Sequence, residues 1–286
     1  MSQKPLIKKM LVAMDLTHMD RLLVQYVSFL ANALPGLEKV TFFHNIRFDF
    51  PEQVAEILQN LEQPLEEKLA EKIEELADEY LDGLDCEIEV TREDNTVEAM
   101  LELQKTNEFD LIMLGKKVSY EGSGYLVERL LHRDLKVNIL VLSESAYHRI
   151  ANILVPIDFS KRSAAALKKA VQVAERAGAK LSCQHVYNIP GIYFPYIPVK
   201  DLRVQMEEDA RKSWAKFLKK YPQTGQAEDV AFSFQAERTT AQTIYDHALT
   251  RQTDLIAVPV GQMPMQSTAI HLLKLDMHIP LLLVKE

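Results

Sequence analysis

The chain has 286 residues, which is long for one α/β domain and sufficient for two domains of about 140 residues each. Hydrophobic residues make up 47% of the chain and charged residues 26%, as in ordinary soluble globular proteins. The net charge of −8 argues against a nucleic-acid-binding protein, which needs basic patches.

The two cysteines and the apolar runs exclude several further classes. Cys86 and Cys183 have no neighbours at metal-ligand spacing, and two thiols make no disulfide framework, so we expect free buried thiols and no metal. Residues 1–15 contain no long apolar stretch followed by a cleavage site. No apolar run approaches the ~20 residues that span a bilayer. We therefore expect a cytoplasmic protein that binds neither membranes nor nucleic acid.

Apolar strands and helical segments alternate along the first half. In chain order we expect strand 8–14, helix 18–34, strand 39–46, helix 52–82 with Pro64 as a candidate break, strand 85–91, helix 96–107, strand 110–115, helix 124–134 and strand 138–143. Such alternation predicts βαβ units, a parallel sheet and helices on both of its faces. The run "NILVL" is apolar throughout, as expected of a strand buried on both sides.

The second half repeats this order. We expect strand 151–157, helix 161–177, strand 180–187, helix 199–220, strand 229–235, helix 239–251, strand 254–259, helix 267–276 and strand 280–284. Gly178 is placed to end the first of these helices in a left-handed conformation.

Matching segments indicate that the chain is a tandem duplication. "KVTFFHNI" (39–46) matches "KLSCQHVY" (180–187), and "EFDLIMLG" (108–115) matches "QTDLIAVP" (252–259). "DLKVNILVLSE" recurs as "DMHIPLLLVKE" at nearly the same offset. The repeat predicts two domains, 1–146 and 147–286, each with a complete five-stranded parallel sheet. We expect the halves to pack as an intramolecular pseudo-dimer through their last strands, which would cover exposed sheet edges, and homodimers remain an open alternative.

A carboxylate follows the first strand of each half, at Asp15 and Asp158. In open α/β sheets, ligands bind outside the carboxyl ends of the strands, so both residues are expected at such a crevice. Asp158 would accept hydrogen bonds from a ribose or an amino group, and Ser160 would cap the next helix. The alternative is that both aspartates only cap a turn.

These residues resemble a known family. "ILVPIDFSKRSAAALKKAVQVAERAGAKLSCQHVY" resembles the opening of a universal stress protein domain, and "DNTVEAMLELQKTNEFDLIMLGKK" resembles its third helix and fourth strand. The resemblance covers nearly the whole chain once per half, although Met14 replaces the motif proline in the first half. It implies two Rossmann-like domains of the adenine nucleotide alpha hydrolase-like type. Some members of the family bind ATP and others do not.

The ATP-binding members carry a Gly-x2-Gly-x9-Gly-Ser/Thr run after the fourth strand, whose bare backbone lets amides approach phosphates. In the first half Gly115 is in place, but Val118 occupies the second glycine position. Gly122 and Gly124 come early, and Tyr125 stands where the Ser or Thr would be. Three further side chains could contact a phosphate: Lys116, Lys117 and Ser123.

The second half departs further from this run. Pro259 replaces the first glycine, and Gln266 stands where the repeat places Gly124. Pro259 and Pro264 also remove amide donors that a phosphate would need. Gly261 and Ser267 remain as plausible contacts, so we expect any ATP to bind the first half more tightly.

The resemblance implies a nucleotide-binding set at the first-strand turns, the second-strand ends and these loops. Its members are Met14, Asp15, Leu16, Thr17, Ile46, Gly115, Lys116, Gly122, Ser123, Gly124 and Tyr125 in the first half, and Pro156, Asp158, Ser160, Val186, Gly261 and Ser267 in the second.

No catalytic set is recognisable: the sequence has no Ser-His-Asp order, HExxH motif, paired catalytic carboxylates or Walker-type loop. The resemblance, together with the eroded glycine run, implies a stress-response regulator with degenerate adenine-nucleotide sites that acts through protein partners. The alternative is a nucleotide-handling protein with weak ATP hydrolysis. A phosphoryl-accepting receiver is a distant third, because no acidic cluster with a lysine beside the acceptor can be recognised.

Overall fold

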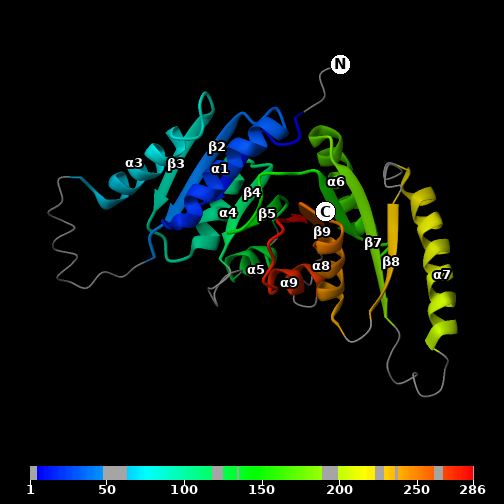
Figure 1. Cartoon of the computed structure of the whole chain (residues 1–286). Coiled ribbons are helices and arrows are strands. Elements are labelled where there is room, and N and C mark those ends of the chain that lie inside the picture. The colour runs from blue at the N-terminus through cyan, green and yellow to red at the C-terminus, as the bar shows by residue number, and fades with distance from the viewer. Residues whose placement is uncertain are drawn as a thin grey trace. The chain divides into compact units, whose positions relative to one another are not determined.

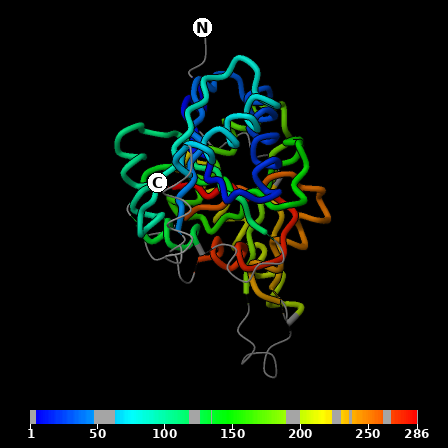
Figure 2. Tube along the Cα trace, turned by 90° about the vertical axis from the view of Figure 1, so that its left-hand side faces the viewer, coloured from blue at the N-terminus to red at the C-terminus, as the bar shows by residue number. Residues whose placement is uncertain are grey.

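The computed structural model describes residues 5–47, 63–117, 125–133, 135–188, 199–222, 229–235, 238–260 and 267–285. The chain divides into two compact units, Met1–Glu144 and Ser145–Glu286. Figure 1 labels the helices and strands of both units, and Figure 2 follows the Cα trace from a second direction. Among the described residues, no helix is long and apolar enough to cross a bilayer.

The first unit is built around a parallel sheet with strand order β3-β2-β1-β4-β5. Its strands are β1 (Lys9–Ala13), β2 (Lys39–Asn45), β3 (Asp85–Thr91), β4 (Leu111–Lys116) and β5 (Asn138–Ser143). Its described helices are α1 (His18–Ala33), α3 (Leu65–Asp78), α4 (Thr96–Asn107) and α5 (Tyr125–Leu131).

The second unit has an equivalent arrangement, in which parallel strands follow the order β10-β9-β6-β7-β8. Its strands are β6 (Asn152–Pro156), β7 (Lys180–Asn188), β8 (Asp229–Gln235), β9 (Leu255–Pro259) and β10 (Leu281–Val284). Its described helices are α6 (Lys161–Ala177), α7 (Val199–Lys220), α8 (Thr240–Thr250) and α9 (Thr268–Leu273).

The predicted fold class is confirmed: each unit is α/β, with a parallel five-stranded sheet and helices. The central strands are buried at consecutive positions, for example Leu11 and Val12 in β1 and all four residues of β10. Since consecutive side chains point to opposite faces, both faces of each sheet are covered. The order of strands changes direction beside β1 and β6, which defines a crevice at their carboxyl ends.

Several helices are shorter than the sequence pattern predicts. Among the described residues, α3 starts after Pro64 and ends at Asp78, ahead of a turn that contains Gly83 at φ +73°. Residues 52–62 of the predicted helix lie outside the described ranges. The last helices of the two units are single short segments, α5 and α9, so the predicted bounds 124–134 and 267–276 are too wide.

Side-chain caps define the starts of the helices next to the crevices. Thr17 caps α1, and its hydroxyl accepts the N–H of Met19. Ser160 caps α6 by accepting the N–H of Ser163. Each cap satisfies a backbone donor that has no partner within its helix. The turn that precedes each helix therefore ends at a defined position.

Gly178 ends α6 as the sequence predicts, with φ +65° and its N–H bonded to the carbonyl of Ala174. A Cβ at this position would contact nothing within 4 Å, so any cost of substitution is that of the backbone conformation. We expect Gly178→Ala to lower the free energy of unfolding by about 1 kcal/mol, because L-residues disfavour the left-handed region. Gly178→Asn should lose less, since asparagine tolerates this region. Denaturant unfolding of both variants tests this; equal losses would contradict it.

Candidate functional site

The turn after β6 presents the carboxylate that the sequence singled out. The Oδ1 atom of Asp158 accepts the backbone N–H of Ser160 at 3.0 Å. Burial alone would raise the pKa of Asp158, but hydrogen bonds from Ser160 and Ser163 and the charge of Arg162 together lower it. The side chain is therefore an ionised acceptor that both shapes the turn and faces solvent.

Phe159 fixes this turn from the other side. It has φ +63°, an uncommon conformation for a residue other than glycine. Its ring lies on the imidazole of His185, with 4.3 Å between the ring centroids. The Nδ1 atom of His185 lies 2.7 Å from the carbonyl oxygen of Ile157. Because a carbonyl only accepts, Nδ1 carries the proton, and the imidazole links β7 to the end of β6.

A cavity of about 330 Å³ lies at the carboxyl ends of β6, β7 and β9. It is lined by strand ends and by the first turns of α6, α8 and α9: Pro156, Ile157, Asp158, Arg162, Gln184, His185, Val186, Thr240, Ile244, Val258, Pro259, Ser267 and Thr268. This volume is within the range of small-molecule sites. We call this cavity the second crevice.

Four of the residues predicted for the second half line the second crevice: Pro156, Asp158, Val186 and Ser267. Ser160 is the cap of α6 beside it, and Gly261 lies outside the described residues. The sequence reasoning missed Arg162, Gln184 and Thr240. Two signals were available: a cation in the first turn after the aspartate, and a polar residue within the second strand of the unit.

In the first unit the corresponding aspartate is already engaged. The Nζ atom of Lys117, which follows β4, lies 2.5 Å from Oδ2 of Asp15, and the hydroxyl of Thr17 donates to Oδ1 at 2.5 Å. Burial would raise the pKa of Asp15, but these hydrogen bonds and the charge of Lys117 lower it. The ion pair therefore joins the ends of β1 and β4. It crosses the carboxyl ends of these strands, the position in the first unit that corresponds to the second crevice, which we call the first crevice.

Gly115 has a packing role in the first unit. A Cβ on this residue would lie 2.5 Å from Cγ of Met19, whose side chain is buried. The glycine predicted to approach a phosphate is thus required by the contact between β4 and α1.

The other residues predicted for the first half are spread more widely. Met14, Ile46 and Lys116 are buried, and Leu16 and Thr17 line a groove between α1 and α3. Gly122, Ser123 and Gly124 lie outside the described residues, and Tyr125 is described only as the first residue of α5. Within the described ranges, the Asp15–Lys117 ion pair brings together the turn after β1 and the end of β4.

Asp20 stabilises the first turn and was not predicted as a site residue. Its carboxylate accepts the N–H of Asp15 at 3.0 Å and the N–H of Leu16 at 2.7 Å. These bonds hold Leu16 at φ +60°, the conformation that Phe159 adopts in the second unit. Burial is the main cause that raises the pKa of Asp20 to about 6, and the charge of Asp15 adds to it. The available signal was an acid three residues after a capping threonine.

We expect the stability of the first unit to depend on pH through Asp20. The pKa of Asp20 is about 6 in the folded state and 3.8 in an unperturbed aspartate, so the folded state holds this proton more tightly. The contribution of Asp20 to the free energy of unfolding is therefore greatest below pH 3.8 and falls by about 3 kcal/mol as pH rises through 6. This titration is absent in Asp20→Asn. The free energy of unfolding of wild type minus that of the variant should therefore fall by that amount between about pH 4 and 6.

Hydrogen exchange of the amides of β1 and α1 measures this difference, because the single tryptophan, Trp214, is in the second unit. The same measurement on β6 and α6 is the control and should show no difference between wild type and variant. A constant or growing difference in β1 and α1 would contradict the assignment.

No group of three or more His, Cys, Asp or Glu side chains within the described ranges could hold a metal ion. Residues 149–275 match the model of the Universal stress protein family. The second half of the chain thus contains a universal stress protein domain. The second crevice lies within this matched segment, between the turn after β6 and Thr268. A comparison with curated proteins finds no match.

Solved structures resemble the whole chain. A universal stress protein from Archaeoglobus fulgidus has a TM-score of 0.61 at 18% identity, covering 99% of this chain and 97% of that one. A functionally unknown protein from Pseudomonas aeruginosa has a TM-score of 0.66 at 13% identity, and the match covers 98% of this chain and 92% of that one. The cytoplasmic domain of a prokaryotic cation chloride cotransporter has a TM-score of 0.52 at 14% identity, and the match covers 96% of this chain and 94% of that one. At such identities the likeness establishes the fold, and function must be argued from the site.

Proposed function

We propose that the protein is a stress-response binding protein of the universal stress type, which takes an adenine nucleotide in the second crevice and acts through protein partners. The observation that carries this proposal is the cavity at the carboxyl ends of β6, β7 and β9, because it combines three kinds of group in one place. Asp158 is an ionised acceptor for ribose hydroxyls, and Arg162 offers a positive charge to a phosphate. Ile157, Ile244 and Val258 supply apolar walls for a base.

We propose further that the first unit is a second domain of the same type whose crevice is occupied by its own side chains. The repeat and the shared strand order support the common origin. A ligand of Asp15 would have to displace Lys117, and Met19 fills the space against Gly115. The glycines of the first half favoured tighter binding there, and that remains a prediction; the geometry favours the second crevice.

The two first-turn residues Met19 and Arg162 differ in a way that bears on this choice. Each follows its helix cap by two residues, in the sequences "THM" and "SKR". Met19 is buried against β4, whereas Arg162 is exposed and lines the second crevice. Arg162→Met therefore gives the second unit the residue of the first and removes the proposed phosphate contact.

We expect Arg162→Met to weaken the binding of ATP by about tenfold or more, since hydrogen bonds to charged groups contribute about 1.5–3 kcal/mol. Lys117→Met should leave the affinity unchanged if the second crevice is the site. Calorimetry on the full chain with ATP compares the two variants. Loss of ATP binding in Lys117→Met alone would instead support the first crevice as the binding site. Measuring phosphate release in the same samples tests the alternative of weak ATP hydrolysis.

Asp158 should contribute to binding beyond its role in the turn. Asp158→Ala should weaken nucleotide binding by about 1–3 kcal/mol, because a polar partner is left unpaired. Asp158→Asn keeps the oxygen that accepts the N–H of Ser160, so it should fold normally and lose less affinity. Calorimetry beside melting curves separates the roles: lower melting temperatures with unchanged affinity would make Asp158 a turn cap only. Asp15→Asn is the matched control in the first unit.

A further inference from the structure

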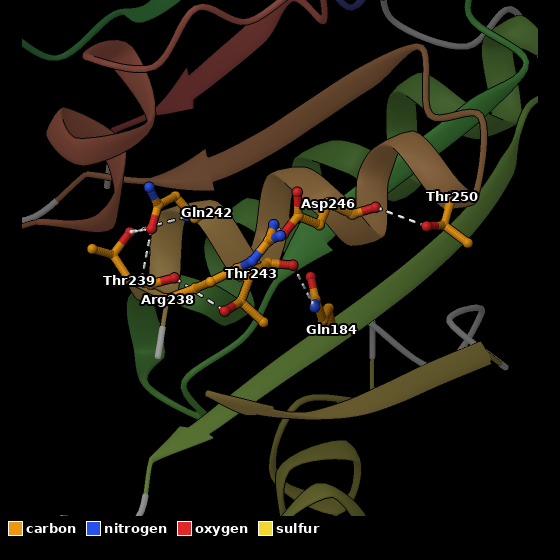
Figure 3. Close-up of polar contacts among 7 residues, drawn as sticks. All are labelled: Gln184, Arg238, Thr239, Gln242, Thr243, Asp246 and Thr250. Carbon is orange, nitrogen blue, oxygen red and sulfur yellow. Dashed lines mark hydrogen bonds and ion pairs between the residues drawn. The ribbon is translucent and has the colours of Figure 1, made fainter. Parts of the chain in front are cut away.

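Gln184 is a buried polar side chain in the wall of the second crevice. It lies on β7 and is 0% exposed. Its Nε2 atom donates to Oγ of Ser233 at 2.9 Å and to the carbonyl of Thr243 at 3.4 Å, the second of which is drawn in Figure 3. Its Oε1 atom has no hydrogen-bond partner among the described residues. Buried acceptors are nearly always paired, so this one requires an explanation.

The orientation of the Gln184 amide is set by α8. The carbonyl of Thr243 can only accept, so Nε2 must face it and Oε1 is left as the free acceptor. The start of α8 is itself fixed: Thr239 and Gln242 form a reciprocal capping box, and Arg238 pairs with Asp246 (Figure 3). The amide of this crevice-lining residue therefore has a defined orientation, with Oε1 as its unpaired acceptor among the described residues.

The fold does not need a polar residue at this position. In the second unit Gln184 pairs with Pro156, and its carbonyl accepts the N–H of Ile157 at 2.8 Å. In the first unit Phe43 pairs with Ala13, and its carbonyl accepts the N–H of Met14 at 2.8 Å. Phe43 thus occupies the equivalent site in an equivalent sheet, where it is 1% exposed. An apolar side chain fills this place without leaving an unpaired acceptor.

We propose that Gln184 determines the specificity of the second crevice by accepting a hydrogen bond from the amino group of a purine base. This inference rests on the proposed function. Arg162 and Asp158 are exposed at the mouth of the crevice, whereas Gln184 is fully buried. The part of a nucleotide that reaches Gln184 is therefore the end farthest from its phosphates, which is the base. Since Oε1 can only accept, the base must present a donor there. Adenine presents its amino group, whereas hypoxanthine has a carbonyl oxygen at the same ring carbon.

The test uses the full chain with two probes that differ at this group, adenosine monophosphate and inosine monophosphate. Wild type should bind adenosine monophosphate about tenfold or more tightly than inosine monophosphate, because a buried site that is built for a donor rejects an analogue without it. Gln184→Met, which keeps the size and removes the acceptor, should lose this preference through weaker binding of adenosine monophosphate. Gln184→Leu is a second variant with the same expectation.

Melting curves without ligand distinguish a role of Gln184 in specificity from a role in stability. Without ligand, Gln184→Met and Gln184→Leu should melt at or above the temperature of wild type, because the unpaired acceptor is gone. The matched control is Phe43→Met, which changes the equivalent position of the first sheet and should leave the affinity for adenosine monophosphate unchanged.

The contrary results are separable. Wild-type protein that binds neither probe would overturn the proposed function and this inference with it. Wild-type binding of adenosine monophosphate that Gln184→Met and Gln184→Leu retain with the same preference would overturn this inference alone. A large fall in the melting temperature of both ligand-free variants would make Gln184 a structural residue and would also overturn it.

Discussion

The turn at the end of the first strand of each unit is the constraint on which both crevices depend. A non-glycine residue adopts a left-handed conformation there, Leu16 at φ +60° and Phe159 at φ +63°. This conformation helps the chain to turn from strand to helix within four residues and leaves the preceding carboxylate at the crevice. The two units stabilise the same turn differently. In the first, the buried carboxylate of Asp20 accepts two backbone donors, and in the second, the ring of Phe159 packs on His185.

The same framework then supports two different crevices, because two equivalent positions, Met19/Arg162 and Phe43/Gln184, carry different chemistry. The first unit has Met19 buried against Gly115, Phe43 in its second strand and Lys117 paired with Asp15. The second unit has Arg162, Gln184 and a cavity of about 330 Å³. Sheet register and strand order are shared by the described strands, so Arg162 and Gln184 differ from Met19 and Phe43 in their side chains at equivalent backbone positions.

The fold could be predicted from the sequence almost completely. Strand and helix periodicity, Gly178 as a helix end and the internal repeat each depend on local pattern, which the chain carries residue by residue. The site could be predicted only in part. Asp158 could be predicted because it follows the first strand of its unit, and Pro156, Val186 and Ser267 could be predicted from the family resemblance. Arg162 and Gln184 were not recognised, because a cation in a first turn and one polar residue in a strand are common and usually unremarkable.

The sequence by itself determined that segments recur in the same order in both halves, that each half alternates strands with helices, and that a carboxylate stands at the end of each first strand. These properties follow from spacing along the chain. Only the tertiary structure decided what those carboxylates face. Asp15 and Lys117 are 102 positions apart (117 − 15), and Met19 and Gly115 are 96 apart (115 − 19), yet each pair is in contact. No local pattern specifies such contacts, because they arise when β1 and β4 pair as neighbours in the sheet and bring the ends of distant segments together.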